Sequence, residues 1–90
     1  MKFDYRIAAI KSKREKKNSL HAEICGCKCN IIHLALKATA VLSVEGVYDD
    51  GIPEKVYTSP VVDIRGEPEM LVIETMNTVY CLERITDDTK

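Results

Sequence analysis

The sequence predicts an α+β domain in which an antiparallel sheet packs on one long apolar helix, in the order ββαβββ. Three observations lead to this fold class: alternating stretches near the N-terminus, a central segment with helical spacing, and three short strand candidates after it. Ninety residues of ordinary globular composition, 46% hydrophobic and 30% charged, predict a single domain over 1–90.

The first predicted unit is a strand hairpin over 3–27. A half-buried strand over 3–11 follows from the period-two spacing of four apolar residues, Phe3, Tyr5, Ile7 and Ala9. The basic run KSKREKKNS predicts a solvated hairpin tip over 11–19, because like charges repel. Alternation predicts a second strand over 20–27, in which Gly26 marks a bulge or a close backbone approach.

The clearest predicted element is a helix over 30–45, with Asn30 as its N-cap and Gly46 near its C-terminal stop. Its apolar residues follow the 3.6-residue period: Ile31, Leu34, Ala35, Ala38, Val41 and Leu42. Its opposite side carries Ile32, Leu36 and Ala40, so the helix is apolar nearly all round. One sheet covers only one side, and buried apolar area stabilises by ~25 cal/mol per Å2. The helix therefore predicts an obligate homo-oligomer.

The C-terminal strands over 55–84 are predicted at 55–64, 69–75 and 78–84. The sequence RGEP joins the first two, and Met76–Asn77 forms a two-residue turn in which Asn77 suits a positive φ. Pro60 lies inside the first of these strands and predicts an edge position or a bulge there.

Charge and targeting signals predict a cytoplasmic protein. Thirteen basic and fourteen acidic residues give a net charge of −1, which argues against a protein that coats nucleic acid or an anionic membrane. No apolar run reaches about 18 residues, and the N-terminal residues lack a signal-peptide pattern. The four cysteines are therefore expected to be free thiols.

Metal binding and catalysis are both disfavoured. Cys25, Cys27 and Cys29 lie near His21 and His33, but their Cys-x-Cys spacing differs from that of zinc knuckles, and Cys81 stands alone. We expect these cysteines to line a packed sheet face, with zinc as the alternative reading. The histidines stand in no catalytic motif, and the paired carboxylates, Asp49–Asp50 and Asp87–Asp88, suit a turn and a tail. We expect no enzyme activity, no metal and no cofactor.

A ligand-binding set is predicted in the C-terminal half from six polar and aromatic residues: Tyr57, Thr58, Arg65, Asn77, Thr78 and Arg84. Tyr57 is proposed to stack on a base, Arg65 and Arg84 to anchor phosphate, and Asn77 with Thr78 to read polar groups. The same residues also suit an ordinary sheet surface.

The stretch YTSPVVDIRGEPEMLVIETMNTVYCLERI carries a family resemblance, in its Thr-Ser-Pro-Val-Val and in the later Thr75, Asn77, Thr78, Tyr80 and Leu82. Together with YRIAAIKSK in the front half, it resembles the phage Thoeris anti-defence sponges. The resemblance implies a protein that sequesters a cyclic ADP-ribose-type signal without cleaving it. It further implies hexamers with pockets between subunits, acting in the host cytoplasm, and separate sites for cyclic oligonucleotides.

Two alternatives from other functional classes remain. One is a protein-directed phage inhibitor of a host defence complex, such as an anti-CRISPR. The other is a nucleic-acid-binding module that uses the basic residues of 11–17.

Overall fold

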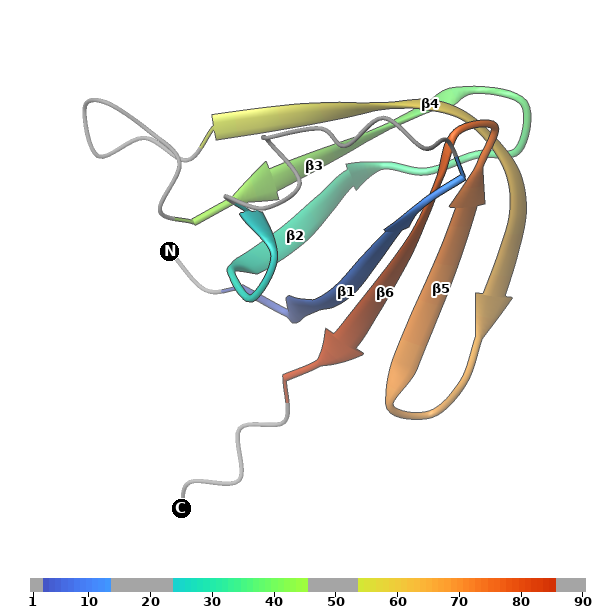
Figure 1. Ribbon diagram of the computed structural model, residues 1–90. Coiled ribbons are helices and arrows are strands. Elements are labelled where there is room, and N and C mark those ends of the chain that lie inside the picture. The colour runs from blue at the N-terminus through green and yellow to red at the C-terminus, as the bar shows by residue number, and fades with distance from the viewer. Residues whose placement is uncertain (1–2, 14–23, 46–53, 86–90) are drawn as a thin grey trace, which may run out of the picture.

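The computed structural model describes residues 3–13, 24–45 and 54–85 of the chain. Six antiparallel strands form a closed barrel in which each strand pairs with its neighbour in sequence and β6 returns to β1 (Figure 1). The strands are β1 (Tyr5–Ser12), β2 (Lys28–His33), β3 (Thr39–Val44), β4 (Glu54–Gly66), β5 (Met70–Thr75) and β6 (Thr78–Arg84).

The predicted helix over 30–45, and with it the α+β fold class and the ββαβββ order, is wrong. Strands β2 and β3 occupy this segment and pair with each other, with Ile31 opposite Leu42. Between them the chain turns at Lys37, whose φ is 69°, a left-handed value that no α-helix interior contains. Among the described residues, only Ile24 has a helical conformation.

The side chains of β3 show why a strand forms here. Ala40, Leu42 and Val44 are fully buried, and this period of two places them on the inner face of the barrel. Leu34, between the strands, packs against the same core, which makes the whole segment apolar and imitates a helical pattern. The homo-oligomer argument that started from a two-sided helix therefore loses its basis.

The two residues predicted to begin and end the helix are Asn30 and Gly46, and the described structure contains no such helix for them to cap. Asn30 lies in β2, and its Oδ1 accepts a hydrogen bond from the Asp4 amide at 2.7 Å. Gly46, the expected stop residue, lies outside the described residues.

The first predicted strand is confirmed as β1, with a shift in its buried face. A bulge between Ile7 and Ala9 breaks the alternation, so Ile7 and Ile10 pack on the core while Ala9 is exposed. The second predicted strand, 20–27, is wrong where it is described. Ile24–Cys27 forms a turn closed by a hydrogen bond from the Cys27 amide to the Ile24 carbonyl, 3.0 Å. Residues 20–23, and residues 14–19 of the predicted hairpin tip, lie outside the described ranges.

The prediction that Gly26 marks a strand bulge or a close backbone approach is wrong, because Gly26 lies in this turn and a Cβ there would have no atom within 4 Å. The turn conformation explains the glycine instead. Its amide donates to the Ile7 carbonyl at 2.7 Å, and its φ of 92° is one that residues with a Cβ rarely adopt.

All three C-terminal strand predictions are confirmed, as β4, β5 and β6. The turn at Met76–Asn77 has the expected length of two residues, but Lys37 rather than Asn77 is the described non-glycine residue with a positive φ.

A bend in β4 divides the barrel into two faces. β4 pairs with β3 up to Pro60 and with β5 from Val61 onward, and an irregularity lies on each side of this change of partner. Pro60 therefore marks the predicted bulge, because proline has no amide for a continuous ladder. The core lies between the two faces, and its largest fully buried side chains are Ile7, Ile24, Leu42, Ile73 and Leu82.

No helical segment among the described residues has the length and hydropathy that crossing a bilayer requires.

Candidate functional site

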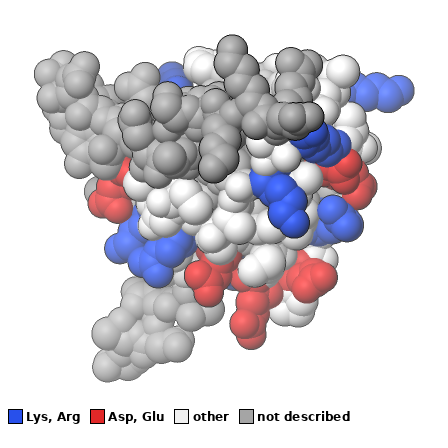
Figure 2. All heavy atoms as spheres, in the orientation of Figure 1, with Lys and Arg blue, Asp and Glu red and all other residues white. Residues whose placement is uncertain are grey.

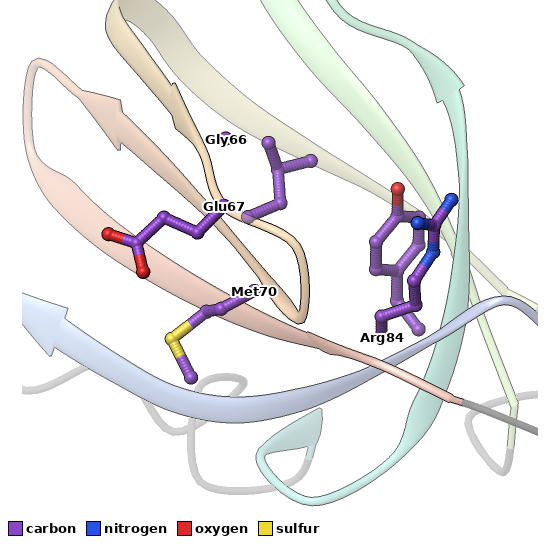
Figure 3. A pocket seen from close by; sticks show the side chains of 6 residues that line it. Gly66, Glu67, Met70 and Arg84 are labelled. Atoms are coloured by element: carbon purple, nitrogen blue, oxygen red, sulfur yellow. The ribbon is translucent and has the colours of Figure 1, made fainter.

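A small cavity opens at the end of the barrel where β6 finishes. Its volume is about 160 Å3, and its lining comes from β1, the end of β4, the β4–β5 connection, β5 and β6: Tyr5, Gly66, Glu67, Met70, Leu71 and Arg84. Figure 3 shows Glu67 and Met70 on one side and Arg84 across from them. The cavity thus brings one aromatic ring, two apolar side chains and one guanidinium to the same place.

Strand pairing holds Tyr5 and Arg84 beside each other. They are register partners of β1 and β6, and the Arg84 amide donates to the Glu69 carbonyl at 2.9 Å. One residue further, the Ile85 amide donates to the Asp4 carbonyl at 2.9 Å. The backbone beneath the Arg84 side chain is therefore fixed on both flanks.

The opposite wall is a tight hairpin end. The Glu67 amide donates to the Met70 carbonyl at 2.8 Å, and the Met70 amide returns a bond to the Glu67 carbonyl at 3.3 Å. These two bonds close a two-residue turn at Pro68–Glu69, in which proline supplies a preset φ.

Side chains of both charges lie at this end of the barrel. Arg84 and Glu67 line the cavity with opposite charges, and the exposed carboxylates of Glu69 and Glu83 belong to the same hairpin end and strand. Figure 2 shows acidic side chains gathered at the lower end of the molecule, with basic ones beside them. A ligand with one anionic group at Arg84 therefore suits this site better than a dense polyanion.

The chemistry of the lining fits part of a nucleotide. A Tyr ring with Leu and Met walls accepts a flat apolar group, an Arg guanidinium binds a phosphate oxygen, and a carboxylate accepts bonds from hydroxyl groups. Pockets for drug-sized ligands start at about 300 Å3. The cavity of one chain therefore holds one fragment of such a ligand and leaves the rest outside.

The six predicted site residues are not brought together. Arg84 lines the cavity, whereas Thr58, Asn77 and Thr78 lie near the other end of β6, about 20 Å away at strand rise. Tyr57 lies on the outer surface of β4, with 66% of its surface exposed. Arg65, further along β4, is engaged with carboxylates: its Nε lies 3.3 Å from Asp63 and its Nη2 3.7 Å from Glu74.

Thr58, Asn77 and Thr78 belong to a hydrogen-bonded hydroxyl network. The Thr58 hydroxyl accepts from the Ala40 amide at 3.0 Å and donates to the Ser59 carbonyl at 2.7 Å. The Ser59 hydroxyl in turn accepts from the Asn77 amide at 3.2 Å. These groups tie β3 and β4 to the β5–β6 turn, so their contacts are structural.

The cysteine cluster forms no metal centre in the part of the chain that the structure describes. There, no three His, Cys, Asp or Glu side chains converge where they could hold an ion. None of the four cysteines forms a disulfide: Cys25 is exposed, Cys29 is buried in the core, and Cys27 and Cys81 are half-buried. His33 is exposed at the end of β2. His21 and both predicted carboxylate pairs lie outside the described residues.

Sequence reasoning missed five of the six lining residues. The sequence pattern places Tyr5 only on one face of a strand, and it places Met70 and Leu71 only within a strand. The signal that could have found them is the meander itself, since it sets the start of β1 beside the end of β6 and the β4–β5 turn. Comparison with protein-family models, with curated proteins and with solved structures gives no match to this chain.

Proposed function

We propose that this chain is a non-enzymatic phage anti-defence protein that binds and sequesters a cyclic nucleotide immune signal of the cyclic ADP-ribose type. The proposal combines the family resemblance of the C-terminal stretch with one structural observation. Tyr5 and Arg84 lie side by side in a cavity with an apolar wall, which is the pairing that a base and a phosphate require.

The mechanism we propose is stoichiometric. The protein holds the signal tightly enough to lower its free concentration below the threshold of the host effector, and releases it unchanged. Strand pairing fixes the backbone of both key residues before the ligand arrives, which reduces the ordering cost of binding.

A homo-oligomer, a hexamer in the family that the chain resembles, would complete this site. The cavity has room for one fragment of a cyclic nucleotide, so a neighbouring copy would enclose the remainder between subunits. The carboxylates beside Arg84 favour a signal with few phosphate charges over a larger cyclic oligonucleotide at this particular site.

Isothermal titration calorimetry with cyclic ADP-ribose and with a cyclic dinucleotide tests this proposal. We expect binding by the unmodified protein, a loss of tenfold or more in Arg84→Ala, and little change in Lys55→Ala, whose exposed side chain lies on β4 away from the cavity. A loss in Arg65→Ala without a loss in Arg84→Ala would move the site to the outer face of β4. No binding of either nucleotide would overturn the proposal.

The fate of the ligand separates sequestration from catalysis. After binding, the protein is denatured by heat and the released small molecule is weighed by mass spectrometry. We expect the intact cyclic nucleotide, whereas a hydrolysed product would make the protein an enzyme.

A second candidate is the protein-directed inhibitor, which a different surface favours. Leu36, Val62 and Met76 surround the bend of β4 and are each about half exposed or more, at 58%, 49% and 60%. Exposed apolar residues that gather in one place are typical of protein interfaces. Val62→Asp and Met76→Asp would then abolish inhibition of a reconstituted defence complex and leave nucleotide binding unchanged.

A further inference from the structure

We propose that two copies of this chain pair through the second half of β4, so that their β4–β5 sheets join edge to edge about a twofold axis at Ile64. The inference goes beyond the proposed function and does not depend on a ligand. It comes from a strand edge that pairs with no residue in the described part of the chain, and whose charges complement those of the same edge in a second copy.

The edge in question is the side of β4 that faces away from β5. β3 leaves β4 at Pro60, and the segment after β2 bonds only to Val61, through the Lys37 amide and the Ala38 carbonyl. Beyond this point, no described residue pairs with that side of β4. Figure 1 shows the lower half of β4 at the right-hand border of the barrel, with β5 on one side.

The ladder with β5 shows which backbone groups point outward along this edge. Glu67 and Met70 exchange two hydrogen bonds, and bonded and non-bonded pairs alternate along an antiparallel ladder. Arg65 and Asp63 therefore bond to β5, while the amide and carbonyl of Ile64 and of Gly66 point the other way. Such groups are a template for another strand.

The charged side chains on this edge favour a second copy of the same strand as its partner. Asp63 and Arg65 are two residues apart, so both lie on the outer face, where their side chains are 51% and 58% exposed. When a second β4 pairs antiparallel with Ile64 opposite Ile64, Asp63 of each copy lies opposite Arg65 of the other. These are the non-bonded positions, where side chains approach most closely and opposite charges stabilise the pair.

Other registers lack this complementarity. A shift that sets Gly66 opposite Ile64 places Arg65 opposite Arg65, and a shift in the other direction places Asp63 opposite Asp63. Like charges directly opposite each other destabilise a sheet. Charged residues on an edge usually prevent pairing, but here the spacing of opposite charges makes the edge self-complementary.

A charge-swap series tests the inference by analytical ultracentrifugation without ligand. We expect the unmodified protein to sediment as a multiple of its 10.1 kDa chain, with a dimer as the smallest associated species. Asp63→Arg and Arg65→Asp each create two like-charge contacts and should weaken association about tenfold or more. The double variant Asp63→Arg/Arg65→Asp restores opposite charges and should recover association.

Each outcome of the series decides the inference. The inference would be overturned if the unmodified protein were a monomer at 100 μM, or if neither single substitution weakened its association. Weakening in Arg65→Asp alone, with no recovery in the double variant, would also overturn it. Lys55→Asp, on the half of β4 that pairs with β3, is the control for charge reversal elsewhere.

Hydrogen exchange on the unmodified protein keeps the test independent of how the variants fold. The amides of Ile64 and Gly66 should gain protection as the protein concentration rises, while that of Lys55 should not. Exchange that stays the same at every concentration would contradict the pairing. Neither experiment involves a nucleotide, so failure here leaves the binding proposal standing, and failure of nucleotide binding leaves the dimer standing.

Discussion

Thr75 and Thr78 are joined by a reciprocal pair of hydrogen bonds that closes the β5–β6 turn. The Thr75 hydroxyl donates to the Thr78 carbonyl at 2.9 Å and accepts from the Thr78 amide at 3.0 Å. The Ser59 hydroxyl of β4 also donates to it, at 2.8 Å. Thr75 is fully buried, so its hydroxyl satisfies the buried amide and carbonyl of Thr78 as well as the partly buried hydroxyl of Ser59.

Replacing Thr75 by valine should therefore destabilise the protein although the two side chains have similar shapes. The Thr78 amide and carbonyl would lose their partner within the barrel, and burying such groups unpaired costs about 2 kcal/mol or more. We expect this loss in urea unfolding monitored by circular dichroism. Thr39→Val makes the same change at a half-buried position on β3 and should cost much less. Equal losses in both variants would argue against the network.

The ion pair between Lys13 and Glu74 predicts a dependence of stability on acid. The Lys13 Nζ lies 2.6 Å from Glu74 Oε2, which links the residue after β1 to β5. This hydrogen bond, with the charge of Lys13 and that of Arg65, lowers the pKa of Glu74 from 4.5. A carboxyl whose folded pKa is lowered stabilises the fold above its unfolded pKa and loses that contribution as the pH falls below 4.5.

We expect Glu74→Gln to melt at a lower temperature than the unmodified protein at pH 7, with the two converging below pH 4. The difference should shrink in 1 M salt, because the groups are partly exposed. Glu69→Gln, in the β4–β5 turn, is the matched control. A difference that persists unchanged at pH 3 would contradict the ion pair as its cause.

The cysteines should differ sharply in reactivity. Burial, with a smaller effect of Cys27, raises the pKa of the Cys29 thiol from 9.0 to about 12. At pH 8 this shift leaves about a thousandfold less thiolate, and the thiolate is the nucleophile. We expect iodoacetamide to modify the exposed Cys25 first and Cys29 only after unfolding, as followed by peptide mass spectrometry. Modification of Cys29 as fast as Cys25 in the folded protein would contradict its burial.

The same shift predicts an alkaline limit to stability. A thiol whose folded pKa is raised contributes fully below its unfolded pKa of about 9, and this contribution is lost as the pH rises from 9 toward 12. Cys29→Ala should remove that part of the alkaline dependence, and Cys25→Ala should not.

The C-terminal half was predictable from sequence because local signals there agree with tertiary structure. Alternation between turn residues predicts 78–84 with the bounds of β6, and Pro60 predicts the bulge that the structure places where β4 changes its partner. The tightness of the β5–β6 turn was also predictable, but its hydroxyl network was not. The sequence predicts Thr58 and Thr78 as ligand contacts, because no local pattern reveals that Ser59 and Thr75 connect them through hydrogen bonds.

The helix prediction for the segment from Ile31 to Val44 is wrong because two hydrophobic periods, that of a strand and that of a helix, can both be found in it. Two short strands and an apolar connection that packs on the core place apolar residues at nearly every position, so a 3.6-residue spacing can be found among them. The contrary signal was the concentration of β-branched residues in Ile31, Ile32, Thr39, Val41 and Val44, which favour strands. The cavity residues were beyond local patterns, because only barrel closure brings Tyr5 to Arg84.

Lys37→Gly distinguishes these two interpretations of the segment by the sign of its effect. In the barrel, Lys37 has a φ of 69°, where a side chain costs roughly 1 kcal/mol, so glycine should raise the free energy of unfolding by about 0.5 kcal/mol. In the middle of a helix, glycine would instead lower it by about 1 kcal/mol. Lys11→Gly, at an exposed lysine within β1, should lower it and serves as the control, because glycine weakens a strand interior. Urea unfolding measures all three proteins, and a loss of stability in Lys37→Gly that matches the loss in Lys11→Gly would contradict the turn between β2 and β3.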